Sequence, residues 1–167
     1  DTKIMLVNNE NLTSIWFDND KSLVQIIDQR FLPHQLKIVT LFSLEDVEYA
    51  IREMQVRGAP LIGVTAAFGM YLASIKNCTN DFLEKSGNFL KKSRPTAVNL
   101  SWAIDKILNT IKNIDEDKRQ NFILNMAKKI RANDIENCKK IGEYGATFIE
   151  NIYNKKKSTV NILTHCN

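Results

Sequence analysis

The spacing of apolar and polar residues is typical of β-strands in the first forty residues and of helices after them. Runs rich in β-branched and aromatic residues cover 14–17 and 23–27, and turn-forming residues fill 18–21 between them. Two such runs around a short polar turn predict a β-hairpin. A third extended segment is expected at 36–41. The chain is therefore predicted to begin with a small antiparallel sheet.

The period changes to that of a helix at Ser43. Ser43 and Asp46 stand three residues apart and predict a capping box at a helix start. One face of this helix is apolar and consists of Leu44, Val47, Ile51 and Met54. A second helix follows from Pro60 and is rich in small residues, including Gly63 and Gly69. Small residues at this density predict close packing against neighbouring helices.

Three further helical segments complete a predicted bundle. They are expected at 81–92, after Pro95 and over 118–153. The helix after Pro95 has one apolar side, formed by Leu100, Ile104, Ile107, Leu108 and Ile111. The inner side of the long last helix is expected to hold Ile123, Ala127, Ile130, Cys138, Ile141, Gly145, Phe148 and Ile152.

The last residues of the chain change character again. Lysines at 155–157 and Ser158 end the helix, and 160–167 form a short run with β-branched residues. Such a run is the profile of a buried strand that enters a parallel sheet. The other strands of that sheet are not visible, so we expect the front part of a longer protein. The predicted fold class is α+β, with a hairpin and helical-bundle domain over 1–157 and the start of a second domain over 158–167.

Composition narrows the class of protein. The 167 residues are 44% hydrophobic and 25% charged, as in soluble globular proteins. The net charge of +4 is mild and its lysines are dispersed over helix surfaces, so no nucleic-acid partner is expected. Three cysteines without a CxxC pair argue against a zinc site or a disulfide framework and fit a reducing compartment. The longest apolar run, 61–73, is short for a membrane span, so no membrane association is expected.

Two helix starts carry the candidate chemistry. Arg57 and Gly58 precede Ala59 and Pro60, and proline is favoured in the first turn of a helix. Free N–H groups at a helix N-terminus beside an arginine suit an anion such as phosphate. The alternative is an ordinary loop-to-helix junction with a solvated arginine. Local pattern alone leaves both interpretations open.

The segment around Arg94 and Pro95 repeats this design at the next helix start. Two arginines at two helix starts are able to converge on a single anion. Asn99 lies one turn into the second of these helices, where it faces either a ligand hydroxyl or solvent.

Five sequence blocks resemble those of the methylthioribose-1-phosphate isomerases. They read DQRFLP at 28–33, VRGAPLIG at 56–63, SRPTAVNL at 93–100, IGEYGA at 141–146 and ILTHCN at 162–167. The blocks occur in the family's order and at the expected intervals, and the similarity runs from about residue 14 to the last residue. The agreement of five blocks favours the phosphate interpretation of both arginines.

The resemblance implies a cytoplasmic two-domain enzyme that acts on a small sugar phosphate. A hairpin and helical bundle would precede a Rossmann-like domain, which also forms a homodimer. The implied reaction converts 5-methylthioribose 1-phosphate to 5-methylthioribulose 1-phosphate in methionine salvage, with no metal and no redox cofactor. Within the same class, the substrate could instead be 5-deoxyribose 1-phosphate or ribose 1,5-bisphosphate.

The resemblance also assigns roles to single residues. Arg57, Gly58 and Ala59 match the first phosphate-binding block, Arg94 matches the second arginine, and Asn99 belongs to the same substrate-binding set. Cys166 matches the catalytic cysteine, and a thiol at a strand end can serve as general acid or base. The family's second catalytic group, an aspartate, lies beyond Asn167. The chain by itself is therefore expected to have little or no activity.

Two other functions are compatible with the sequence. The family is also similar to the regulatory subunits of eukaryotic translation initiation factor 2B, which are not enzymes. Those relatives do not in general keep the three blocks with Arg57, Arg94 and Cys166 together, and all three are present here. The third possibility is a stable helical module that binds no ligand.

Overall fold

A computed structural model describes residues 6–7 and 10–165. The chain divides into two compact units, 1–131 and 132–167, and each is considered by itself. At the start of the first unit, β1 (Leu6–Val7) pairs with β2 (Glu10–Asn11) in an antiparallel manner.

The main sheet of the first unit has three antiparallel strands. They are β3 (Ile15–Asp18), β4 (Leu23–Ile27) and β5 (Ile38–Leu41), in the order β3-β4-β5. The register pairs Ile15 with Ile26 and Val24 with Leu41, and all four side chains are buried. Since alternate residues of a strand face opposite sides, this pairing places the apolar face toward the helices. The predicted hairpin and third strand are thus confirmed.

The first helix, α1 (Leu44–Arg52), begins as predicted. The Ser43 hydroxyl accepts a hydrogen bond from the Asp46 amide at 3.1 Å, and the Asp46 carboxylate accepts one from the Ser43 amide at 3.0 Å. Leu44, Val47 and Ile51 are buried, but Met54 lies beyond the end of the helix and is exposed. Its φ of 54° shows that the backbone has already left the helical path.

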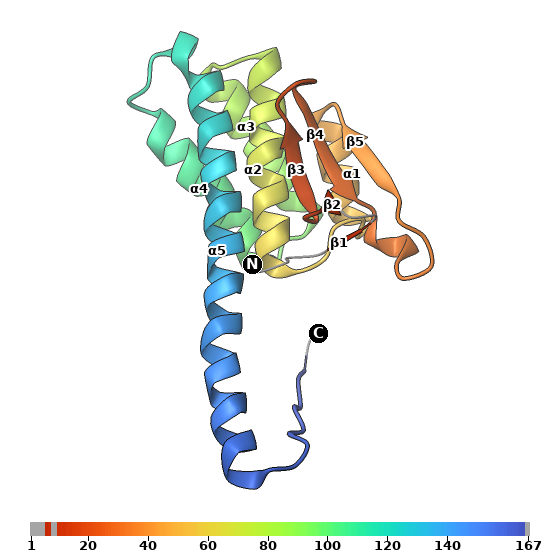
Figure 1. The fold of residues 1–167 in the computed structure, drawn as a ribbon. Helices are drawn as coiled ribbons and strands as arrows, with labels where there is room; N and C mark the ends of the chain where they lie inside the picture. The colour runs from red at the N-terminus through yellow and green to blue at the C-terminus, as the bar shows by residue number, and fades with distance from the viewer. Residues whose placement is uncertain (1–5, 8–9, 166–167) are drawn as a thin grey trace. The chain divides into compact units, whose positions relative to one another are not determined.

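Four more helices follow: α2 (Ala59–Lys76), α3 (Asn80–Ser93), α4 (Val98–Ile111) and α5 (Glu116–Lys156). In the first unit, α2 is the central helix and packs against α1, α3, α4 and β3 (Figure 1). Every residue of α2 from Ile62 to Ser74 is buried. The predicted small sheet followed by a helical bundle is confirmed.

The length and hydropathy of α2 would by themselves allow a membrane span, although the apolar run seen in the sequence was expected to be too short for one. Among the described residues it is the one helix with this property. Within the structure, 72% of α2 is buried by other protein elements, as in the core helix of a folded domain.

Glycines let the helices approach one another closely, as the small-residue pattern predicts. A Cβ atom on Gly69 would lie 2.7 Å from Val47 Cγ1 and 3.0 Å from Leu90 Cδ1. A Cβ atom on Gly87 would lie 2.7 Å from Ile104 Cγ2. These distances are shorter than van der Waals contact, so a side chain at either position would push the helices apart.

The first part of α5 belongs to the first unit. Ile123, Ala127 and Ile130 are buried on its inner side, as predicted. The Arg131 guanidinium donates to the backbone oxygen of Ile15 at 2.6 Å and to the Thr13 hydroxyl at 2.7 Å. These two bonds connect α5 to the start of β3.

The second unit contains the rest of α5 and differs from expectation. Of the residues predicted to mark its inner side, Ile141, Phe148 and Ile152 are exposed and Gly145 is half-buried. The exposed apolar stripe consists of Ile141, Tyr144, Phe148, Ile152 and Tyr153. Cys138 is also exposed rather than packed in a core. The helical spacing is correct, but nothing among the described residues buries this stripe.

The strand expected near the end of the chain is not formed in the described residues, since 157–165 adopt neither helix nor strand. A strand is stabilised by hydrogen bonds to a neighbouring strand, and the described part of the second unit offers none. Residues 166 and 167 lie outside the described residues.

We expect Gly69→Ala to destabilise the protein. The added methyl group overlaps the Val47 and Leu90 side chains, and overpacking of this kind costs about 1–3 kcal/mol. Gly142→Ala is the matched control, because no atom lies within 4 Å of its added Cβ and alanine favours a helix by about 0.5–1 kcal/mol. Urea unfolding of both variants measures the difference. A Gly69→Ala variant at least as stable as the native protein would contradict the packing described here.

Candidate functional site

The loop before α2 presents an arginine and a glycine to solvent. Gln55 and Val56 are buried, whereas Arg57 and Gly58 are exposed. Gly58 has φ 103° and ψ 128°, a conformation that side-chain-bearing residues rarely adopt. No side chain caps the helix at Gly58. The first amides of α2 are therefore available to a ligand.

The start of α4 has a similar construction. Ala97 is its N-cap residue, and no side chain caps this helix either. The backbone oxygen of Arg94 accepts a hydrogen bond from the Ala97 amide at 3.0 Å, which closes a turn directly before the helix. Arg94 and Asn99 are half-buried at this helix start. An uncapped helix N-terminus with a nearby arginine favours an anion.

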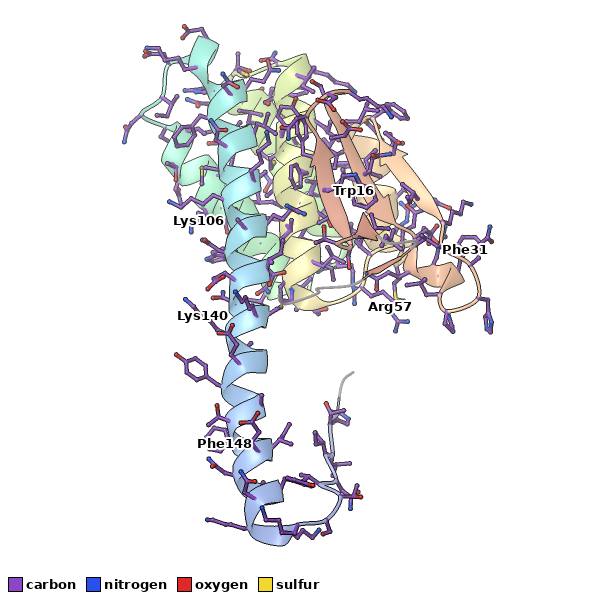
Figure 2. All side chains as sticks on the ribbon, viewed as in Figure 1. Trp16, Phe31, Arg57, Lys106, Lys140 and Phe148 are labelled. Carbon is purple, nitrogen blue, oxygen red and sulfur yellow. The ribbon has the colours of Figure 1, made fainter. Side chains whose placement is uncertain are left out.

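The fold brings these two helix starts together. A Cβ atom on Gly63 would lie 2.9 Å from the backbone oxygen of Asn99, so the second turn of α2 packs directly on the first turn of α4. Figure 1 shows both helices starting at the same end of the bundle, and α3, which connects them along the chain, runs in the opposite direction. Figure 2 shows the Arg57 side chain extending from the loop that precedes α2.

Five of the six predicted site residues thus occupy one end of the first unit. Arg57, Gly58 and Ala59 are exposed at the start of α2, and Arg94 and Asn99 are half-buried at the start of α4. Cys166, the predicted catalytic residue, lies outside the described residues. No group of three or more His, Cys, Asp or Glu side chains in the described part of the chain is arranged to hold a metal ion.

A buried ionic network next to this end of the bundle was not singled out by the sequence patterns. Asp28, at the end of β4, is fully buried. Its carboxylate accepts hydrogen bonds from the Arg30 guanidinium at 2.9 Å and 2.7 Å and from the Gln55 side-chain amide at 2.9 Å. These donors stabilise the charged form, so the pKa of Asp28 is lowered despite its burial. The one available signal was the DQRFLP block itself.

The same network raises the pKa of Arg30, chiefly through its hydrogen bonds to Asp28. The Arg30 side chain remains 35% exposed, so the pair is buried on the carboxylate side alone. A second hydrogen bond accompanies the one between the side chains of Gln55 and Asp28: the backbone amide of Gln29 donates to the backbone oxygen of Gln55 at 2.9 Å. The end of β4 is thereby connected at two points to the loop that leads to Arg57.

Comparison with known proteins identifies the fold and its relatives. Residues 55–167, more than half of the chain, match the Initiation factor 2 subunit family. The chain belongs to this family.

Curated members of the family share much of the sequence. The chain is 44% identical to the methylthioribose-1-phosphate isomerase of Rhizobium meliloti (strain 1021), over 98% of this chain and 45% of that protein. It is 40% identical to the isomerase of the same name from Escherichia coli O45:K1 (strain S88 / ExPEC), over 98% of this chain and 44% of that protein. The chain therefore spans less than half the length of these relatives. The resemblance carried by the five blocks is confirmed.

Two solved structures have the same fold. Translation initiation factor eIF-2B subunit delta from A. fulgidus superposes with a TM-score of 0.74 at 33% identity, over 82% of this chain and 42% of that one. The 5-methylthioribose 1-phosphate isomerase from Pyrococcus horikoshii OT3 superposes with a TM-score of 0.72 at 37% identity, over 80% of this chain and 40% of that one. The fold is thus shared by an isomerase and by an initiation-factor subunit, and fold alone does not separate the two functions.

We expect Asp28→Asn to lower the free energy of unfolding by about 2–3 kcal/mol at pH 7. Breaking a fully buried ion pair costs about 3–5 kcal/mol, and the solvent exposure of Arg30 reduces that cost. Because the pKa of Asp28 is lowered in the folded state, its stabilisation is complete above the unfolded-state value of about 3.9 and is lost as the pH falls through the folded-state value. The free energies of unfolding of the native protein and the variant should therefore converge at acidic pH.

Denaturant unfolding at pH 7 and at pH 3 measures this difference. Asp105→Asn serves as the control, since its pair with Lys91 is about half exposed and should contribute less than about 0.5 kcal/mol. Equal effects of the two substitutions at pH 7 would show that the Asp28 network contributes nothing beyond a surface ion pair.

Proposed function

We propose that the whole protein converts 5-methylthioribose 1-phosphate to 5-methylthioribulose 1-phosphate, and that this chain supplies part of the substrate site. The observation that carries the proposal is the pairing of two uncapped helix N-termini, each preceded by an arginine. Such a pair suits the doubly charged phosphate of a sugar 1-phosphate. The curated relatives, which are methylthioribose-1-phosphate isomerases, support the same substrate.

The proposed roles follow from the chemistry of each group. Arg57 and the amides at Gly58 and Ala59 bind the phosphate from the α2 side, and Arg94 binds it from the α4 side. Asn99 lies in the first turn of α4 and binds a sugar hydroxyl. Phosphate binding at the end of the bundle would hold C1 and C2 of the sugar at a fixed position for reaction.

The isomerisation needs acid and base groups but no net oxidation. The bond between C1 and the ring oxygen breaks as that oxygen takes up a proton. The hydrogen on C2 is transferred to C1, and the C2 hydroxyl loses its proton as the C2 carbonyl forms. We assign Cys166 to one of the proton transfers, with an aspartate from the remainder of the whole protein as its partner.

The domain arrangement is part of the same proposal. Residues 1–157 form the N-terminal domain, and 158–167 begin a Rossmann-like domain that also forms the homodimer of a cytoplasmic enzyme. The greater length of the relatives supports this arrangement. In the whole protein, the second domain would cover the exposed apolar stripe of α5, because a stripe of this kind is unfavourable in water.

A regulatory role is the second candidate. It is favoured by the superposition on the initiation-factor subunit, whose TM-score matches that of the isomerase. The isomerase is the better supported of the two, because the motif residues Arg57, Arg94 and Cys166 occur together in this chain.

The activity is tested with the whole protein and three sugars. We expect turnover of 5-methylthioribose 1-phosphate, detected as the ketose product, with a higher kcat/KM than for 5-deoxyribose 1-phosphate or ribose 1,5-bisphosphate. A preference for one of the other two sugars would correct the substrate but keep the reaction class. Absence of turnover on all three would favour the regulatory role. The 167-residue chain assayed alone should show little or no turnover.

Cys166→Ser should lower the isomerase activity by about 10²-fold or more, because a hydroxyl is far less acidic than a thiol and is a poor proton-transfer group. Binding of inorganic phosphate should stay unchanged in this variant. Arg57→Lys should instead weaken phosphate binding, since lysine cannot form the bidentate contact of arginine. Steady-state kinetics and calorimetry distinguish the two effects. Full activity of Cys166→Ser would remove the thiol from the mechanism.

A further inference from the structure

Gln55, which belongs to the buried Asp28 network, precedes the proposed phosphate-binding residue Arg57 by two positions. We propose that Gln55, held by Asp28, is a positioning residue that fixes the loop carrying Arg57 and so sets the affinity of the site for phosphate. This inference rests on the proposed function for its ligand class, a phosphate monoester or inorganic phosphate.

Arg30 already supplies Asp28 with ample hydrogen bonds. Its backbone amide donates to Asp28 at 3.2 Å, in addition to the two guanidinium contacts. All three of these bonds stay within one short segment of chain. The bond from Gln55 differs, because it crosses 27 positions of sequence and connects the sheet to the loop before α2. Its distinctive effect is therefore on the position of that loop.

Two backbone hydrogen bonds fix the loop as far as Val56. The backbone oxygen of Gln55 accepts a hydrogen bond from the backbone amide of Gln29 at 2.9 Å, and the backbone amide of Val56 donates one to the backbone oxygen of Ala50 at 3.3 Å. The Val56 side chain is fully buried. Two consecutive residues directly before Arg57 are thus held, Gln55 by the segment that follows β4 and Val56 by α1.

Arg57 itself is held by its backbone alone. Within the described residues, neither a hydrogen bond nor an ion pair engages its guanidinium, and its side chain is exposed. The position from which it reaches a phosphate therefore depends on the backbone at 55–58. A loop already ordered in the binding conformation avoids the entropic cost of ordering it when the ligand binds.

The test uses the whole protein and inorganic phosphate as the probe. Gln55→Met keeps the length of the side chain but removes the donor, and Gln35→Met is the matched control at an exposed glutamine. We expect Gln55→Met to weaken phosphate binding by about fivefold in calorimetry, the size expected when one side chain and its loop must be ordered on binding. Gln35→Met should bind like the native protein.

A double-mutant cycle with Arg57→Ala separates positioning from general stability. If Gln55 acts through the loop that carries Arg57, Gln55→Met should weaken phosphate binding by a smaller factor in the Arg57→Ala background than in the native protein. Independent, multiplicative losses would overturn the inference, as would unchanged affinity in Gln55→Met. A native protein that does not bind phosphate at all would overturn it too.

The phosphate titration does not depend on turnover. A whole protein that binds phosphate but does not isomerise the sugar would refute the proposed reaction, while the cycle would still decide the role of Gln55. Conversely, an active enzyme in which the two substitutions cause independent, multiplicative losses of phosphate affinity would keep the reaction and refute the positioning role.

Discussion

The close approach of α2 and α4 is the constraint on which the candidate site depends. Gly63 provides the space, because any side chain there would meet the backbone of Asn99. The approach places the positive ends of two helix dipoles next to each other, with Arg57 before one and Arg94 before the other. Positive charge gathered in this way is unfavourable in an empty site and becomes favourable once an anion binds. The packing of the bundle and the proposed chemistry are thus connected through one pair of helices.

The remainder of the first unit holds these helices in place. The buried face of the three-stranded sheet and the apolar sides of α1 and α3 surround α2, which has almost no exposed surface along its middle. At the end of β4, the Asp28 network adds a polar connection to the loop before α2. A buried carboxylate needs strong partners to be tolerated, and Arg30 supplies them. The Gln55 side chain donates to the same carboxylate and so holds the loop before α2 in place.

Features set by neighbours in the sequence could be predicted from it. The hairpin, the Ser43 capping box and the proline-marked helix start depend on a few adjacent residues. Features set by distant neighbours could not. The partnership of Asp28 with Gln55 spans 27 positions and has no periodic signature. The inner side of α5 was predicted correctly where the first unit covers it, at Ile123 and Ile130, and wrongly at Phe148, where helical spacing alone cannot say what buries a face. The resemblance to a known family supplied what spacing could not, namely the substrate class that we propose.

The central claim is that Arg57 and Arg94 bind one phosphate. The most direct test is a crystal structure of the whole protein with 5-methylthioribose 1-phosphate or inorganic phosphate bound. The account predicts a single phosphate group within hydrogen-bonding distance of both guanidinium groups and of the amides at the start of α2. Guanidinium groups that point to opposite sides of the molecule, with the phosphate bound away from both, would contradict it.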